Sequence, residues 1–209
     1  MSKPSLILIG AGGHASACID VIELLDTFEI AGLVGTEEEL QDENLGYQVL
    51  DTDSALPKLA KQYQYTLVAV GQIESSIVRQ RLYGQALALG FKLPSIISPT
   101  AYVSRHAKVG SGTIVMHGAI VNAGAKVGEN CIINSNALIE HDAIVADHCH
   151  ISTGAILNGT VDIGLGSFVG SGSIIKQGVT LGSNCVVGMG IFVRHRHPDN
   201  SRILTNGKL

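Results

Sequence analysis

The sequence predicts a chain in two parts, a small α/β domain followed by a solenoid of short parallel strands. Three observations predict it. From Ile97 to Val193 an aliphatic residue stands at every sixth position, seventeen times without an exception. A second row, almost entirely small or β-branched, runs four positions behind the first from Ala101 to Ile191. Ahead of this repeat, residues 1–97 hold short apolar runs, glycines and amphipathic segments.

The period of six fits neither one face of an α-helix nor a single long strand. It is typical of a solenoid in which each six-residue unit forms one side of a triangular coil and stacks on its neighbours. The aliphatic row is expected to fill the interior of the prism, and the small row to lie where the walls crowd together. No long insertion interrupts the repeat, so the solenoid should make just over five coils.

The α/β part is expected to begin with a buried parallel strand at Ser5–Ile9, a compact apolar run. The glycine turn Gly10-Ala-Gly-Gly-His14 follows, and a helical pattern continues to about Leu25. A strand, a glycine turn and a helix in this order form the setting in which backbone N–H groups bind phosphate.

The remaining elements complete a small three-layer, Rossmann-like domain with the order β-α-β-α-β-α-β. They are expected as a strand at Glu29–Val34, a helix at Asp53–Gln62, a strand at Tyr65–Val70, a helix at Ser75–Gly90 and a last, short or edge strand at Phe91–Ile97 that holds Pro94. The carboxyl ends of three strands, at Gly10, Gly35 and Gly71, should then line one crevice, where open α/β sheets bind ligands.

The spacing Gly10-x-Gly12-x-x-Ala15 meets the looser form of the dinucleotide fingerprint. A dinucleotide site would also place an acidic residue at the end of the second strand, where Gly35 and Thr36 stand, and would need a domain about twice this size. A mononucleotide-bearing ligand is therefore favoured over NAD. The alternative is a glycine turn that does no more than pack a helix on a strand.

Composition excludes several classes of function. The net charge is −4 and charged residues make up 15%, so nothing indicates nucleic acid as a partner. No apolar run approaches the roughly 20 residues of a spanning helix, which argues against a membrane protein. The run Ser5–Leu8 breaks into glycines and does not resemble a secretory leader, so the cytoplasm is the expected compartment. The cysteines are expected to be small buried side chains, with no metal site; they are Cys18, Cys131, Cys149 and Cys185.

Chemistry on the solenoid has to come from outward residues. The segment Asn134–Asp142 is unusually polar for two repeats, and His141 stands where the chain turns a corner, followed by Asp142. A carboxylate beside an imidazole fixes its tautomer and is the equipment of a general base; the alternative is a solvated histidine. Since His150 lies nine positions on, half a coil away, a site that uses both histidines should be assembled from two chains, and a trimer matches the three sides. No Ser–His or Cys–His pair has a suitable spacing, so direct transfer is favoured over an acyl-enzyme.

The chain resembles the hexapeptide-repeat acyltransferases, and within them the group of sialic-acid O-acetyltransferases and UDP-N-acetylbacillosamine N-acetyltransferases (the NeuD/PglD-like group). The motifs that carry the resemblance are the glycine turn Gly10–His14, the segment Ile139–Asp142 and the stretch His150–Gly159. The resemblance covers nearly the whole length. It implies a left-handed parallel β-helix, an exception to the usual right-handed crossover, in a homotrimer that uses acetyl-CoA. Residues 1–97 would be a nucleotide-sugar-binding domain, and residues 98–209 the acyltransferase domain with a short tail from Asn200.

The resemblance also implies roles for single residues. His141 would be the general base and Asp142 the acidic residue that raises its basicity. The acetyl end of acetyl-CoA would contact His150, and further cofactor contacts would come from Gly159, Ser171 and Met189. The nucleotide sugar would contact Gly12, Gly13, His14, Gly35, Thr36 and Gly71. The sequence departs from the group's pattern at Ser171 and Met189, where Ile and Gly are commoner, at the corner Gly35-Thr36, which lacks acidic residues, and in having no Gly-x-Pro-Ala segment near its end.

The leading hypothesis is an N-acetyltransferase that acts on a nucleotide-linked 4-amino-4,6-dideoxy sugar for surface polysaccharide or glycoprotein synthesis. The N-terminal crevice supports it, because a solenoid alone would suffice for a small free acceptor. One alternative is O-acetylation of sialic acid. Another, of a different class, is a non-catalytic trimeric scaffold that carries a ligand-sensing α/β domain.

Overall fold

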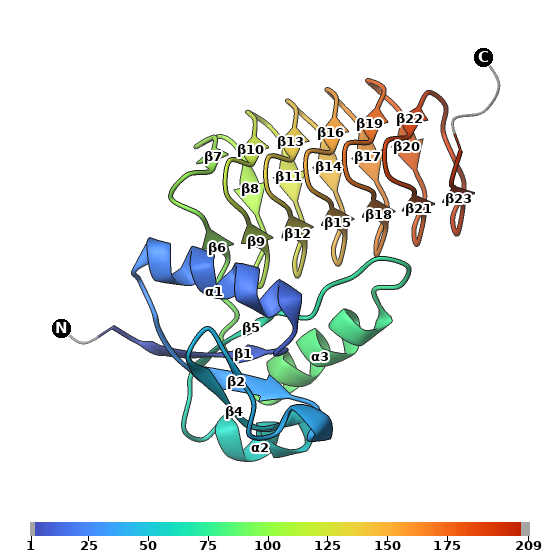
Figure 1. The fold of residues 1–209 in the computed structure, drawn as a ribbon. Coiled ribbons are helices and arrows are strands. Elements are labelled where there is room, and N and C mark those ends of the chain that lie inside the picture. Colours follow the sequence, from blue (N-terminus) through green and yellow to red (C-terminus); the bar gives the residue numbers. More distant parts are fainter. Residues whose placement is uncertain (1–2, 206–209) are drawn as a thin grey trace.

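The computed structural model of the protein describes residues 3–205. Its two parts are the expected ones: an α/β domain, and a stack of coils that forms a parallel β-helix (Figure 1). None of the helices within the described residues is both long enough and apolar enough to cross a membrane.

The N-terminal domain is built on a five-stranded sheet with the order β3-β4-β2-β1-β5. Its strands are β1 (Ser5–Ile9), β2 (Glu29–Gly35), β3 (Glu43–Asn44), β4 (Tyr47–Thr52) and β5 (Tyr65–Val68). All neighbouring strands are parallel except the pair β3–β4. Helix α1 (Gly13–Leu25) packs on the sheet face that holds Leu6 and Leu8, and helices α2 (Leu56–Leu59) and α3 (Ile77–Ala88) pack on the face that holds Ile7 and Ile9. The period-2 alternation of β1 therefore separates the two halves of this core.

Two expectations about this domain were wrong. No sheet strand spans Phe91–Ile97: Lys92 makes a single bridge to Tyr65, and Ile96–Ile97 is strand β6 of the β-helix, whose Ile96 N–H donates to Thr113 O at 2.9 Å. The first coil thus takes this segment away from the sheet. The position beside β2 is instead filled by β4, and the expected helix at 53–62 is shortened to a 3₁₀ turn, Asp53–Ala55, and α2.

The β-helix has three faces, which we name by what covers them. The domain face, which lies against the N-terminal domain, has strands β6 (Ile96–Ile97), β9 (Ile114–Val115), β12 (Ile132–Ile133), β15 (His150–Ile151), β18 (Phe168–Val169), β21 (Val186–Val187) and β23 (Arg202–Ile203). The apolar face has β7 (Tyr102–Val103), β10 (Ile120–Val121), β13 (Leu138–Ile139), β16 (Ile156–Leu157), β19 (Ile174–Ile175) and β22 (Phe192–Val193). The polar face has β8 (Lys108–Val109), β11 (Lys126–Val127), β14 (Ile144–Val145), β17 (Asp162–Ile163) and β20 (Thr180–Leu181).

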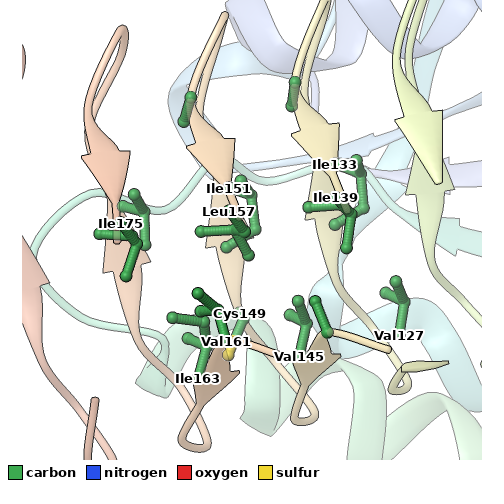
Figure 2. Close-up of a cluster of buried hydrophobic side chains, with 14 of the residues drawn as sticks. Val127, Ile133, Ile139, Val145, Cys149, Ile151, Leu157, Val161, Ile163 and Ile175 are labelled. Carbon is green, nitrogen blue, oxygen red and sulfur yellow. The ribbon is translucent and has the colours of Figure 1, made fainter. Parts of the chain in front are cut away.

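Both repeated rows point into the prism, as the period predicts (Figure 2). The aliphatic row is buried from Val115 to Val193, and Ile97, Val103 and Val109 are partly buried in the first coil. The small row, including Cys131, Cys149 and Cys185, fills the rest of the same core. Removing such a side chain leaves a cavity that close-packed neighbours cannot fill, at a cost of about 2–5 kcal/mol. The inward rows are thus accounted for by stability alone.

The corners of the coils are made by residues in the left-handed backbone region, which Gly, Asn and Asp adopt at least cost. Asn136 and Asp142, with φ of 57° and 58°, are two of them. At the C-terminal end the chain is more ordered than the expected tail, since β23 pairs in parallel with β21. Residues 206–209 of that predicted tail lie outside the described range. The predicted domain boundary after residue 97 stays a prediction; β6 stands directly before it.

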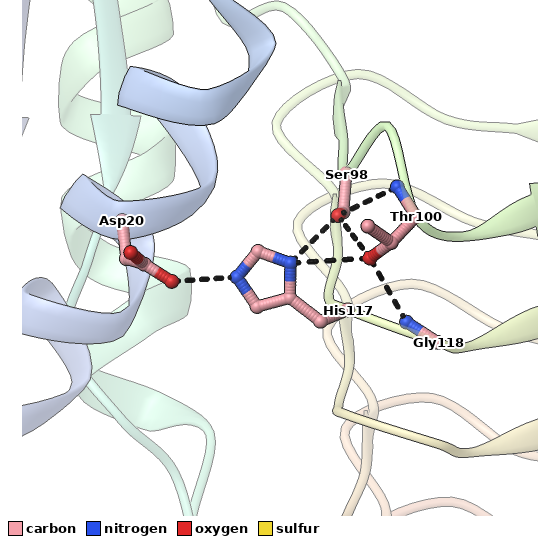
Figure 3. A network of polar contacts seen from close by, with 5 residues as sticks. All are labelled: Asp20, Ser98, Thr100, His117 and Gly118. Carbon is pink, nitrogen blue, oxygen red and sulfur yellow. Dashed lines mark hydrogen bonds and ion pairs between the residues drawn. The ribbon is translucent and has the colours of Figure 1, made fainter.

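Several polar contacts hold the N-terminal domain on the β-helix, and two of them lie at opposite borders of the domain face. Arg79 of α3 is buried and donates to Val68 O at 2.8 Å, Val70 O at 2.6 Å and Asn130 Oδ1 at 2.8 Å; burial lowers the pKa of its guanidinium to about 10. On α1, the Asp20 carboxylate lies 2.8 Å from His117 Nε2, whose other ring nitrogen lies 2.8 Å from Ser98 Oγ (Figure 3). The N-terminal domain is therefore attached to the β-helix at both borders of the domain face, at Asn130 on one side and at His117 on the other.

Candidate functional site

A cavity of about 690 Å³ opens at the carboxyl ends of β1, β2 and β5. The six residues predicted to contact a nucleotide sugar all line it: Gly12, Gly13, His14, Gly35, Thr36 and Gly71. These residues come from three separate turns, and the parallel sheet brings the turns together because its strands end at one border. The crevice is therefore where the sequence placed it.

The glycine turn at the start of α1 is shaped for a close-approaching ligand. Gly10 has φ of 126°, and a Cβ there would lie 2.8 Å from the Ala69 carbonyl carbon, so only glycine fits. Gly12 and Gly13 differ, because a Cβ on either would meet no atom within 4 Å. Their empty space adjoins the N-terminus of a 13-residue helix, whose free N–H groups and dipole favour an anion such as phosphate.

His14 lies at the floor of this turn and is held neutral. Desolvation lowers the pKa of its imidazole to about 3, and the nearby positive charge of Arg79 and the His150 ring add to the effect. Its Nε2 lies 3.6 Å from Cys18 Sγ. A neutral ring here offers a ligand hydrogen bonds and no charge.

The opposite wall of the cavity carries charged groups that the sequence analysis missed. Asp53 and Arg81 line it and form an ion pair at 3.0 Å. Asp53 directly follows β4, so missing that strand meant missing the side chains at its carboxyl end. On the Gly35-Thr36 corner, the Glu39 carboxylate accepts the Thr36 N–H at 2.8 Å and leaves no room for a Cβ on Gly35.

His141 stands at the edge of the prism between the apolar and polar faces, which we call the His141 edge; residues 105–106, 123–124, 141–142, 159–160, 177–178 and 195–196 form it. Its ring Nδ1 lies 3.0 Å from Asp142 Oδ2, and the backbone N–H of His141 donates to Glu140 Oε2 at 3.0 Å. An aspartate on Nδ1 holds the proton there and leaves the Nε2 lone pair free to accept another. The side chain is 55% exposed, so Nε2 is accessible to a substrate.

Gly159 lies one coil further along the same edge, directly beneath this imidazole. A Cβ on Gly159 would come within 2.6 Å of His141 Nε2 and 2.7 Å of Cε1. The glycine thus makes the space in which the ring sits. The structure gives Gly159 this neighbour in addition to its predicted contact with the cofactor.

His150 lies on a strand of the β-helix and not at one of its corners. It is on strand β15 of the domain face and only 7% exposed, packed edge-on against the Phe168 ring at 5.2 Å. Its Nδ1–H donates to Gln72 O at 2.6 Å, and its Nε2 accepts from Asn134 Nδ2 at 3.1 Å. Burial lowers the pKa of this imidazole to about 4, so the ring is neutral.

Ser171 and Met189 lie at a second edge, between the domain and apolar faces, which we call the Ser171 edge. Ser171 Oγ lies 2.9 Å from Ser152 Oγ, and Met189 is 81% exposed. Of the residues predicted to contact the cofactor, Gly159 therefore lies at the His141 edge, Ser171 and Met189 lie at the Ser171 edge, and His150 lies on the domain face. The whole apolar face separates the two edges within one chain.

The buried thiols offer no covalent route. All four cysteines are free and buried, as expected. Burial raises the pKa of Cys18 and of Cys131 to about 12, so neither is a thiolate near neutral pH. The chain provides a phosphate-type crevice beside the domain face and a base at the edge opposite that face. Within one chain the body of the β-helix lies between the two.

Comparisons with known proteins place the chain clearly. The PglD N-terminal domain matches residues 5–86, the bacterial transferase hexapeptide repeat matches residues 106–141 and 124–159, and the hexapeptide repeat of succinyl-transferase matches residues 160–194. No curated protein matches the chain.

Three solved structures are similar over nearly the full length. The acetyltransferase domain of PglB from Neisseria gonorrhoeae, also solved with acetyl coenzyme A, is 33% identical, with 98% of each chain covered and a TM-score of 0.89. A variant of perosamine N-acetyltransferase from Caulobacter crescentus, solved with CoA and GDP-perosamine, is 31% identical over 99% of this chain and 96% of that one, with a TM-score of 0.92. WeeI from Acinetobacter baumannii, 21% identical over 97% of this chain and 98% of its own with a TM-score of 0.83, shares the fold.

Proposed function

The chain belongs to the NeuD/PglD-like group of hexapeptide-repeat acyltransferases, and from this premise we propose that it transfers acetyl from acetyl-CoA to the amino group of a nucleotide-linked 4-amino-4,6-dideoxy sugar. One observation carries the proposal: the chain has both a crevice suited to bind phosphate and a histidine whose ring is oriented by an aspartate. A non-catalytic scaffold that only senses a ligand would not need the histidine–aspartate pair.

The histidine at the edge does the acid–base chemistry. His141 Nε2 accepts a proton from the sugar amine as its nitrogen attacks the thioester carbonyl carbon. The C–N bond forms, the C–S bond breaks, and the departing thiolate takes up the proton that His141 accepted, which returns the histidine to its neutral form without an acyl-enzyme. Asp142 keeps the imidazole in the required tautomer and stabilises its protonated form.

The crevice holds the other end of the acceptor. The free N–H groups at the start of α1 suit a diphosphate, while Gly12 and Gly13 leave it room. Thr36 and Gly71 border the space on either side, and neutral His14 adds a hydrogen-bonding group at the floor. His150, on strand β15 of the β-helix, is hydrogen-bonded to the Gln72 carbonyl in the loop after β5 and so links the domain that holds the crevice to the coils.

The site becomes complete in a homotrimer. The outward row of the apolar face is unbroken: Tyr102, Ile120, Leu138, Ile156, Ile174 and Phe192. Tyr102 is 58% exposed and Phe192 42%, whereas the row in the same positions of the polar face is mostly polar: Lys108, Lys126, Ile144, Asp162 and Thr180. Such a ridge favours burial against copies of itself. Three apolar faces around one axis place the His141 edge of one subunit beside the Ser171 edge and domain face of the next.

The acceptor is tested with a panel of compounds and acetyl-CoA, by following thiol release and the mass of the product. Nucleotide-linked 4-amino sugars should be acetylated on nitrogen, and free sialic acid should not. Transfer to sialic acid alone would establish the O-acetyltransferase alternative. Light scattering tests the assembly: a monodisperse monomer with full activity would contradict the shared site.

A further inference from the structure

The side chain of Asn44, on strand β3, is hydrogen-bonded to the glycine turn at the start of α1. Its Nδ2 donates to Ala11 O at 2.7 Å and to Gly12 O at 3.3 Å. A carbonyl oxygen can only accept, so the amide atom that faces both carbonyls has to be the nitrogen. On its other side, Asn44 Oδ1 accepts from Ser16 Oγ at 2.9 Å, which fixes the amide in this orientation. One side chain thus joins the glycine turn to the first turn of the helix.

The hairpin β3–β4 carries Asn44 to this position from a distant part of the chain. Asn44 pairs with Tyr47 across the two antiparallel strands, and the loop Leu45-Gly46 between them has φ of 52° and 84°. Two left-handed residues in succession are typical of the tightest hairpin turn. Tyr47 Oη in turn donates to Glu23 Oε1 at 2.9 Å, further along α1. The hairpin is therefore bonded to α1 at two points, and Asn44 is held against the turn.

The glycine turn has no side chain of its own to hold its peptide groups. Its N-cap residue is Gly12, which cannot cap the helix with a side chain. A Cβ on Gly12 or Gly13 would meet no atom within 4 Å, so no neighbour holds these two residues by packing either. Glycine peptides rotate at little cost, and the bonds from Asn44 are what fix them here.

The bonds from Asn44 also set the direction of the N–H groups. A trans peptide is planar, so its N–H points opposite to its C=O. With the Ala11 carbonyl held by Asn44, the Gly12 N–H points away from Asn44, and the same holds for the Gly12 carbonyl and the Gly13 N–H. Asn44 and Ala11 line a separate hollow of about 420 Å³, whereas Gly12 and Gly13 line the crevice. The two N–H groups are thereby turned toward the crevice.

We propose that Asn44 is a positioning residue of the acceptor site, which fixes the glycine turn so that the N–H groups of Gly12 and Gly13 face the diphosphate of the nucleotide sugar. The inference rests on the proposed function, because it takes that diphosphate to bind at the start of α1. Donors that are already oriented lose little freedom when the ligand arrives, so Asn44 strengthens binding of the phosphates. Its effect should appear in the KM of the nucleotide sugar and not in kcat, since His141 is untouched.

The test is calorimetric titration of wild type and Asn44→Ala with GDP, UDP and dTDP, and with guanosine, uridine and thymidine, which lack the phosphates. Each diphosphate that the wild type binds should bind Asn44→Ala about tenfold more weakly, while the affinity for its nucleoside stays the same. Ser16→Ala, which frees the amide to turn, should weaken the diphosphate in the same sense but less. The matched control is Gln48→Ala: Gln48 lies on the same hairpin, bonds only to Glu43 at the surface and should bind all ligands like wild type.

The outcomes separate this inference from the proposed function. If the wild type binds none of the three diphosphates, the proposed function itself fails. If it binds one of them and Asn44→Ala binds that ligand equally well, the positioning role alone is wrong. Asn44→Asp keeps the shape of the side chain but has no donor, so wild-type affinity for the diphosphate in this variant would also overturn the role. A parallel loss of nucleoside and diphosphate affinity, with a lower melting temperature, would show that Asn44 only holds the hairpin in place and would refute the proposal.

Discussion

Replacing Gly159 by alanine should displace the base while leaving the fold intact. The added methyl would lie 2.6 Å from His141 Nε2, and ordinary contacts begin near 3.4 Å, so the imidazole has to retreat by about 0.8 Å. Gly159 has no left-handed φ, so alanine strains no backbone there. A misplacement of about 1 Å costs on the order of 10²-fold in rate. We therefore expect kcat to fall by about 10²-fold.

The assay measures kcat, KM and the Kd of CoA for the variant, with the melting temperature as a check on folding. Gly84→Ala serves as control: a Cβ there meets nothing within 4 Å, and alanine in the α3 helix should keep activity and add up to about 1 kcal/mol of stability. The reasoning is refuted if Gly159→Ala keeps its kcat. A weakened CoA Kd with unchanged kcat would instead assign Gly159 to the cofactor alone.

Three further predictions concern the base, the buried histidines and the domain contact. His141→Ala should lower turnover by roughly 10²–10⁴-fold while the affinity for CoA stays nearly unchanged. Equal turnover in wild type and variant would show that His141 is not the base. Folding lowers the pKa of His14 to about 3 and that of His150 to about 4. Below about pH 6.5 the two histidines are therefore protonated in the unfolded chain but stay neutral in the folded one. The free energy of unfolding is then highest above about pH 6.5 and falls by a few kcal/mol as the pH drops toward 3. Urea unfolding at several pH values should show this slope, reduced in the His14→Asn/His150→Asn double variant, and an identical slope would contradict the assignment. Arg79→Met leaves the carbonyls of Val68, Val70 and Asn130 without their donor and should lower the free energy of unfolding in urea by about 3 kcal/mol. Arg81→Met, which removes the exposed ion pair with Asp53, should lower it by less than about 1 kcal/mol. Equal losses in the two variants would contradict a stabilising role of the buried Arg79 contact.

The solenoid was predictable because every inward position meets the same surroundings. The core requires one aliphatic side chain per six residues at Val115 and at Val187 alike, so the period of the fold is visible in the sequence. The crevice was predictable for a related reason, since glycine turns after apolar strands mark the carboxyl border of a parallel sheet. In both cases a local rule is enough.

The surroundings of His150 were not predictable, because they come from packing between distant segments. Its ring is held by Gln72, 78 residues earlier in the chain, and nothing in the hexapeptide pattern tells whether an outward strand position is covered by a domain or by water. Strand β4 was missed for a different reason: Leu50, which is exposed, and Asp51, which is partly buried, break the simple alternation of a half-buried strand. The Asp53 carboxylate at the end of this strand, which pairs with Arg81, was missed with it.

The claim that the site belongs to two subunits can be tested by mixing two inactive variants. His141→Ala removes the base, and Gly13→Asp places a carboxylate in open space beside the helix N-terminus, where it should repel a diphosphate without disturbing the fold. Trimers that carry both variants, isolated through two different tags, contain one intact site in three if base and crevice come from neighbouring chains. We expect about a third of the wild-type activity in these mixed trimers. If they are as inactive as either variant alone, base and crevice lie in one chain and the shared site is wrong.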